Sequence, residues 1–112
     1  MVIPVLLYRI FLNLLNNSLE QIAKNGHGEI FISSEADDKY NYLHFRDTAG
    51  GAPAYLVAHL FDGFNTTKEK GTGVGLAFCK LTMKSFDGDI ICHSIEGDYM
   101  EFVLSFPILF DE

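Results

Sequence analysis

Three glycines stand at alternate positions directly after two lysines in the segment 67–76, which reads Thr-Lys-Glu-Lys-Gly-Thr-Gly-Val-Gly-Leu. Glycine has no Cβ, so its main-chain N–H groups can approach an anion closely. A helix that begins here would also direct the positive end of its dipole at that anion. The segment therefore predicts a phosphate-binding loop, and a flexible turn before a helix is the alternative interpretation.

Two familiar phosphate-binding motifs do not match this segment. A Walker A loop requires lysine directly after glycine, and lysine follows none of the ten glycines in the chain. A dinucleotide fingerprint requires a strand before the glycines, whereas the residues before Gly71 are rich in phenylalanine, threonine and lysine and predict a loop. These patterns exclude a P-loop and disfavour a Rossmann turn.

An aspartate ends the second of the four predicted strands. Alternation over residues 40–47 puts Leu43, Phe45 and Asp47 on one face. A carboxylate in line with two core side chains is costly to desolvate unless something pairs with it. We therefore expect Asp47 to have a partner.

The elements that position these residues follow from hydrophobic periodicity. Helices are predicted over residues 5–24, 54–60 and 74–85, and strands over 29–34, 40–47, 89–94 and 100–106. The first helix has an apolar face and an opposite polar face: Leu7, Phe11, Leu14, Leu15 and Ile22 against Asn13, Asn17, Glu20 and Lys24. This order predicts an α/β (α+β) fold, a two-layer sandwich of a mixed or antiparallel sheet with helices on one face.

Composition limits the class of protein. A chain of 112 residues that is 48% hydrophobic can fill one core, so we expect a single domain over residues 1–112. The apolar runs are short and no leader pattern is present, which predicts a cytoplasmic domain without direct membrane contact. Cys79 and Cys92 lack metal-site spacing and lie in apolar segments, so we expect buried free thiols.

The charge distribution excludes one class of partner and favours another. A net charge of −7 argues against a nucleic-acid surface. Half of the eight cations nevertheless lie within residues 68–84, where they predict an attraction for phosphate that a divalent cation would assist: Lys68, Lys70, Lys80 and Lys84.

Four segments in this order resemble the motifs of the ATP-binding catalytic domain of sensor histidine kinases. That family shares the Bergerat nucleotide fold with gyrase, Hsp90 and the mismatch-repair ATPases. The segment 12–20 resembles its N box, 45–52 its G1 box, 60–68 the F box of its lid, and the glycines from 71 to 75 its G2 box. The resemblance covers about residues 8–107 and implies a fragment of a longer sensor kinase, whose parent could be anchored in the inner membrane. The forms Asn-Asn-Ser and Asp-Thr-Ala-Gly-Gly are similar to those of quorum-sensing autoinducer sensor kinases.

The resemblance implies a catalytic group of three residues. Asn17 would give its amide oxygen to Mg²⁺, which prefers oxygen ligands, and a solvated helix face is the alternative interpretation of this residue. Asn13 lies one turn earlier, and an amide cannot activate water as the glutamate of hydrolytic relatives does. Water is therefore not the expected phosphate acceptor. Lys68 would contact the phosphates.

The resemblance also implies a set of contacts with ATP. Asp47 would accept a hydrogen bond from the adenine amino group, which would provide the expected partner. The phenylalanines of the F box fit a lid over ATP and ordinary core packing equally well. The other expected contacts are Asn17, Gly51, Phe61, Phe64, Thr67, Lys68, Gly71, Thr72, Gly73, Val74, Gly75 and Leu76.

Three departures from the family pattern keep other functions open. Glu20 stands in place of a phosphate-binding lysine, Ala49 in place of the first G1 glycine, and Met100 in place of a small hydroxyl residue near adenine. The alternatives are a degenerate, non-catalytic signalling scaffold, or a serine kinase or anti-sigma switch protein of the same superfamily.

The function that the resemblance implies is that of a protein-histidine kinase in two-component signal transduction. It would bind Mg-ATP and transfer the γ-phosphate to a histidine on a separate helical dimerisation domain, with a response regulator as an indirect partner. The chain's own histidines do not lie in such a hairpin, so we expect them to be structural or exposed: His27, His44, His59 and His93. The isolated domain would be a monomer.

Overall fold

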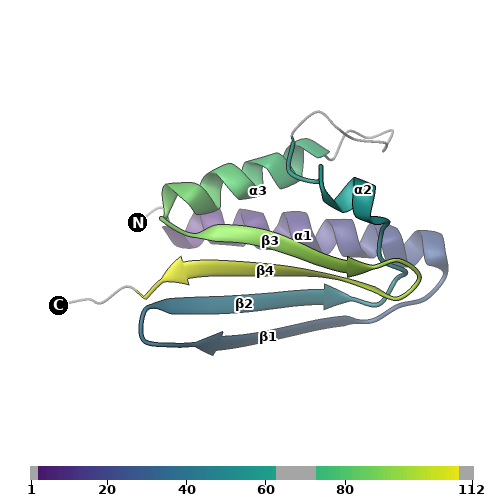
Figure 1. Ribbon diagram of the computed structural model, residues 1–112, viewed down its shortest axis with the longest axis horizontal. Helices are drawn as coiled ribbons and strands as arrows, with labels where there is room; N and C mark the ends of the chain where they lie inside the picture. The colour runs from purple at the N-terminus through teal and green to yellow at the C-terminus, as the bar shows by residue number, and fades with distance from the viewer. Residues whose placement is uncertain (1–2, 63–72, 109–112) are drawn as a thin grey trace.

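The computed structural model describes residues 3–62 and 73–108. Its elements are α1 (Ile3–Asn25), β1 (Ile30–Ala36), β2 (Tyr40–Asp47), α2 (Ala54–Val57), α3 (Gly73–Ser85), β3 (Asp89–Ile95) and β4 (Tyr99–Pro107). These strands form an antiparallel sheet in the order β1-β2-β4-β3, and α1 and α3 lie on the same side of it (Figure 1). The predicted two-layer sandwich is confirmed, with the antiparallel form of the sheet.

Both long helices end at the predicted turns. Gly26, after α1, has a φ of +92°, and its N–H donates to the Ile22 carbonyl at 2.8 Å, which closes the last turn. After α3, the N–H of Gly88 donates to the Met83 carbonyl at 2.9 Å. A Cβ at Gly88 would collide with the Ser105 carbonyl oxygen, so the turn into β3 requires glycine.

The core lies between the helices and the inner face of the sheet. It contains the buried side chains Ile10, Leu14, Phe45, Leu76, Cys79, Met83, Ile90, Met100, Phe102 and Leu104. The predicted apolar face of α1 is confirmed for Leu14, while Ile10, which the periodicity analysis did not single out, is also fully buried. The ring of Phe11 meets that of Phe45 edge-on, with centroids 5.4 Å apart, and so joins α1 to the sheet.

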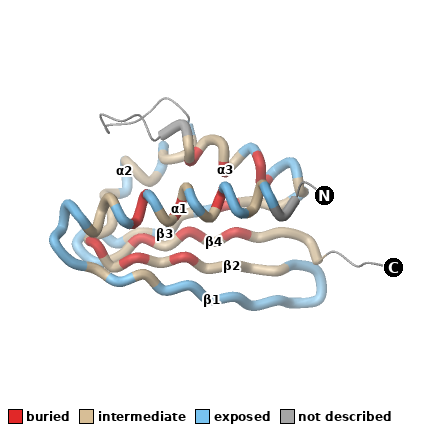
Figure 2. Tube along the Cα trace, turned by 180° about the vertical axis from the view of Figure 1, so that it is seen from behind, coloured by how far each residue is buried: buried red, intermediate tan, exposed pale blue. Residues whose placement is uncertain are grey.

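Strand β1 forms one edge of the sheet and is almost wholly exposed (Figure 2). Ile30, at its start, packs against the core, but Ile32 on the same face is 48% exposed. The predicted strand is therefore present, but its two faces do not alternate in burial. An edge strand has a sheet neighbour on one side alone, here β2, which leaves more of it open to solvent.

Candidate functional site

Asp47 is the last residue of β2, and its carboxylate faces α1. The residue is 2% exposed. Ser18 Oγ donates to Oδ2 at 2.7 Å, and the main-chain N–H of Ala49 donates to Oδ1 at 3.1 Å. The expectation that Asp47 has a partner is confirmed, and the structure identifies a partner within the chain.

Sequence reasoning missed Ser18. Ile10, Leu14 and Ser18 follow one another at a spacing of four, so Ser18 continues the buried stripe of α1. Its exposed fraction is 0%. A buried hydroxyl requires a hydrogen-bond partner inside the protein, and its position in an apolar stripe was the signal that could have found it.

The two asparagines expected at the site lie on α1 beside a cleft of about 440 Å³. Asn17 is 9% exposed, so its interpretation as part of a solvated helix face is wrong. The start of α3 lies against α1 one turn earlier, where Gly75 approaches Asn13. The cleft is lined by Asn13, Asn16, Asn17, Leu19, Glu20, Ala23 and Leu76.

Asn13 and Gly75 meet where α1 and α3 approach each other. A Cβ at Gly75 would lie 2.5 Å from Asn13 Oδ1. The Asn13 side chain is held in place because its Nδ2 donates to the Arg9 carbonyl at 3.1 Å. Gly75 therefore has a packing reason to lack a side chain, in addition to the phosphate contact predicted for it. Leu76, its neighbour, is buried in the core as well as lining the cleft.

The loop that follows β2 is attached to the β3–β4 hairpin. Ser94 Oγ accepts a hydrogen bond from the Ala52 N–H at 2.7 Å. Gly51 has a φ of +60°, and a Cβ there would collide with the carbonyl oxygens of Ile95 and Tyr99. Gly51, expected near adenine, thus has a structural reason to be glycine.

The departures at Ala49 and Met100 are accommodated by packing. Ala49 is buried, and a Cβ at Gly28 would lie 3.2 Å from the Ala49 Cβ, so the glycine leaves space for this methyl group. Met100 pairs with Asp47 in the β2–β4 register and belongs to the core. Both residues therefore fit the fold.

Phe61 packs as a core residue. Its ring meets that of Phe102 edge-on with centroids 6.2 Å apart, and Lys80 Nζ lies 5.1 Å from its centroid. Phe61 is partly buried and packs against the core, and its expected contact with ATP stays a prediction. Gly73 and Val74 are the first two residues of α3. The remaining expected residues lie outside the described part of the chain: Phe64, Thr67, Lys68, Gly71 and Thr72.

The prediction that the lysines within residues 68–84 together attract phosphate is wrong for Lys80 and Lys84. Lys80 Nζ lies 2.8 Å from Asp89 Oδ1 and donates to the Ile90 carbonyl at 2.8 Å. Lys84 Nζ lies 3.6 Å from Asp89 Oδ2. These two lysines pair with the start of β3 instead of adding charge to the glycine segment. Lys68 and Lys70 lie outside the described residues.

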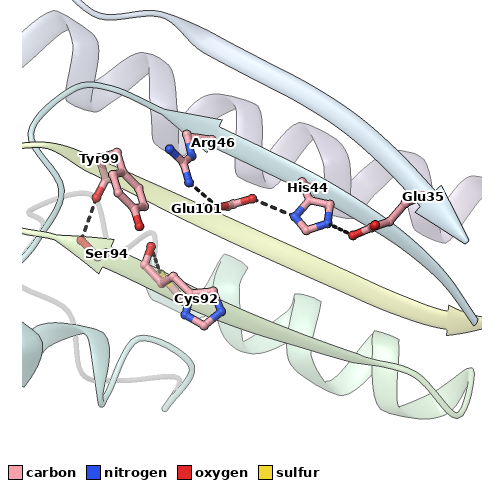
Figure 3. Close-up of polar contacts among 8 residues, drawn as sticks. Glu35, His44, Arg46, Cys92, Ser94, Tyr99 and Glu101 are labelled. Atoms are coloured by element: carbon pink, nitrogen blue, oxygen red, sulfur yellow. Dashed lines mark hydrogen bonds and ion pairs between the residues drawn. The ribbon is translucent and has the colours of Figure 1, made fainter.

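An ionic line crosses the other face of the sheet, away from the cleft (Figure 3). His44 Nε2 lies 2.8 Å from Glu35 and its Nδ1 lies 2.8 Å from Glu101. Arg46 donates to Glu101 at 2.9 Å, and its guanidinium carbon stands 3.8 Å from the centroid of the Tyr99 ring. The expectation that His44 is structural is confirmed, because these contacts join β1, β2 and β4.

These contacts shift the pKa values of His44 and Glu101. The hydrogen bond to Glu35 raises the pKa of His44 most, burial opposes it, and Glu101 adds to the rise. Burial raises the pKa of Glu101, but hydrogen bonds from Arg46 and His44 outweigh it and hold that pKa below its usual value. The two carboxylates therefore stabilise the protonated form of His44.

The two cysteines are free, as expected, with Cys79 buried and Cys92 partly buried. Burial raises the pKa of Cys79 to about 12. The pKa of Cys92 is also raised to about 12, by burial first and then by the negative charges of Asp47 and Glu101. Neither thiol is a nucleophile at neutral pH, because the thiolate is the reactive form.

Two further properties of residues 3–62 and 73–108 bear on the site. No three histidine, cysteine, aspartate or glutamate side chains there are grouped so that they could hold a metal ion. No helix of this part is both long and apolar enough to span a membrane.

The buried aspartate, the asparagine-lined cleft and the layered fold agree with one family. Residues 3–109 match the family described as histidine kinase-, DNA gyrase B- and HSP90-like ATPases. The chain belongs to this family. As a member of the histidine kinase-like ATPases, it has a fold that confirms the Bergerat-type architecture implied by the sequence motifs.

Three similar curated proteins are named as kinases. The CAI-1 autoinducer sensor kinase/phosphatase CqsS of Vibrio cholerae is 36% identical over 92% of the chain, and the autoinducer 1 sensor kinase/phosphatase LuxN of Vibrio harveyi is 35% identical over 89%. Sporulation kinase C of Bacillus subtilis is 30% identical over 94%. The chain spans 15%, 12% and 24% of the lengths of these three relatives. The predicted similarity to autoinducer sensor kinases is confirmed.

Proposed function

We propose that this chain is the ATP-binding catalytic domain of a sensor histidine kinase. Mg-ATP binds beside α1, with adenine at Asp47 and the phosphates in the cleft at the start of α3. The γ-phosphate is presented to a histidine on a separate helical dimerisation domain, and a response regulator receives the phosphoryl group from there.

The observation that carries this proposal is the buried carboxylate of Asp47, which is bonded to Ser18 of α1, the helix whose asparagines line the cleft. In the described structure this carboxylate accepts one hydrogen bond from Ser18 and one from Ala49. An ionised carboxylate has about four acceptor positions. The remaining capacity is suited to a donor such as the exocyclic amino group of adenine.

Mg²⁺ fits the residues at the cleft. The Asn17 amide lies on the cleft wall, in a position with little exposure to solvent. Mg²⁺ prefers oxygen ligands and usually keeps several waters and substrate phosphates around it, so the Asn17 amide oxygen is a compatible protein ligand. When bound, the cation would neutralise charge that develops on the transferred phosphoryl group.

The chain's own residues would act by binding and positioning. Asp47 orients the base, Asn17 and Asn13 stand at the phosphate end of the cleft, and Lys68 supplies positive charge. Phosphoryl transfer in such sites depends on positioning and charge stabilisation. An amide does not serve as a general base for water, so transfer to a protein histidine is favoured over hydrolysis.

Calorimetric titration with ATP, with and without Mg²⁺, tests this function. We expect saturable binding that Asp47→Asn weakens by about 10- to 100-fold, the equivalent of the 1.5–3 kcal/mol of a hydrogen bond to a charged group. Asn17→Ala should abolish the Mg²⁺ dependence of binding.

Asp89→Asn is the matched control, because it makes the same chemical change to an aspartate that pairs with Lys80 at the other end of α3. It should leave ATP affinity unchanged. A folded wild-type chain that binds no ATP would favour the non-catalytic scaffold. Equal losses in the two aspartate variants would show that Asp47 acts through stability alone.

A further inference from the structure

We propose that Ser18 is a positioning residue that makes the site selective for a 6-aminopurine, by fixing the direction of the Asp47 carboxylate. This inference rests on the proposed nucleotide function. Ser18 lies on α1 and has no exposure to solvent, and its hydroxyl reaches across the two layers to Asp47 Oδ2 at 2.7 Å. It is not expected to touch the nucleotide itself.

Two donors hold the carboxylate of Asp47 from different directions. The Ser18 hydroxyl approaches Oδ2 from the helix layer, and the Ala49 N–H approaches Oδ1 from the loop after β2. With both oxygens engaged, rotation of the carboxylate about its terminal bond is restricted, although that bond is otherwise soft. The unused lone pairs therefore point in fixed directions.

A fixed carboxylate distinguishes purines by the group at position 6. The amino group of adenine is a donor and matches an acceptor-only carboxylate, whereas the carbonyl oxygen of guanine or hypoxanthine is an acceptor and would be left facing another acceptor. Mismatched polar groups in a dry site are rejected strongly because they remain unpaired. If the carboxylate could rotate, part of this selectivity would be lost.

A purely structural role for the same hydrogen bond predicts a different result. In that case the bond would only join α1 to β2. Its loss would lower stability and would reduce the affinity for every nucleotide by the same factor. A positioning role predicts a loss of affinity that occurs only for nucleotides with a 6-amino group. Comparing ATP with purine riboside triphosphate, which lacks that group, separates the two.

The test measures the dissociation constants of both nucleotides with Mg²⁺ by calorimetry for the wild-type chain and Ser18→Ala. We expect Ser18→Ala to weaken ATP binding about tenfold, which is equivalent to about 1.4 kcal/mol. The binding of purine riboside triphosphate should change less than about twofold. Ser18→Thr retains the hydroxyl and should keep most of the wild-type ratio. Far-UV circular dichroism establishes that each variant is folded.

Leu14→Val is the matched control, because Leu14 lies one turn earlier on the same buried stripe and is not hydrogen-bonded to Asp47. It should lower stability and leave the ratio of the two nucleotide affinities unchanged. Equal weakening of both nucleotides by Ser18→Ala, or no weakening of either, overturns the role of Ser18 while leaving ATP binding intact. A folded wild-type chain that binds neither nucleotide overturns the proposed function itself.

Discussion

Replacing Gly75 with alanine should raise stability when the Asn13 side chain is absent and should fail to raise it when that side chain is present. Alanine is favoured over glycine in a helix by about 1 kcal/mol. The new Cβ would lie 2.5 Å from Asn13 Oδ1, so this side chain must rotate away. That rotation breaks its bond to the Arg9 carbonyl, worth about 0.5–1.5 kcal/mol, and an off-rotamer side chain costs a similar amount.

The net change in the free energy of unfolding follows from these opposing terms. In the wild-type background Gly75→Ala should leave stability unchanged or lower it by up to about 2 kcal/mol, because the lost hydrogen bond and the strain cancel or exceed the gain in helix propensity. In an Asn13→Ala background the obstruction is gone, and Gly75→Ala should raise stability by about 1 kcal/mol. The coupling between the two sites is thus about 1–3 kcal/mol.

Urea unfolding of the four proteins, followed by circular dichroism, measures this coupling through the midpoints, provided that the m values agree. Asn16→Ala serves as a control background, because Asn16 lines the same cleft but is exposed. There Gly75→Ala should behave as in the wild type. If Gly75→Ala has the same effect with and without Asn13, within about 0.3 kcal/mol, the two helices do not approach each other as closely as described.

The ionic line and the thiols give three further predictions. The folded state raises the pKa of His44 above its usual 6.5, so its contribution to stability is full below that value and is lost as the pH rises through the folded pKa. His44→Gln should therefore lower the melting temperature at pH 6 more than at pH 9. The pKa of Glu101 is lowered from 4.5, so its contribution is present above that value and is lost as the pH falls through the folded pKa; Glu101→Gln should cost less stability at pH 3 than at pH 7. Cys79 and Cys92 should react with a thiol reagent at pH 8 much more slowly in buffer than in urea, because the folded state raises the pKa of each to about 12; equal rates would contradict their burial.

Local pattern predicted much of the candidate site. The alternation over β2 placed Asp47 on the core face, and a buried carboxylate implies a partner on physical grounds alone. The identity of that partner did not follow from the pattern, because Ser18 and Asp47 are brought together by the packing of α1 on the sheet. Pairing across layers depends on tertiary geometry, which hydrophobic periodicity does not contain.

The lysines of α3 show how nearness in sequence can mislead. Lys84 lies nine residues beyond Gly75, which is about 14 Å along a helix axis at 1.5 Å per residue. A cluster of charge in the sequence is therefore spread along the helix, and its far end meets Asp89 of β3. The strand order likewise could not be predicted from the sequence pattern, since β2 pairs with β4 and not with β3.

That strand order has a consequence for how the protein is made. The sheet runs β1-β2-β4-β3, so the strand synthesised last of the four occupies an interior position and pairs with both β2 and β3. On the ribosome, β1 and β2 can form a hairpin early, but β3 has no partner in the sheet until β4 emerges. The loop after β2 is also held by the β3–β4 hairpin, because the Ala52 N–H donates to Ser94 Oγ, so this loop is fixed only after that hairpin has formed. Domains generally fold as units during synthesis, and here the proposed nucleotide site would be completed only when β4 leaves the exit tunnel.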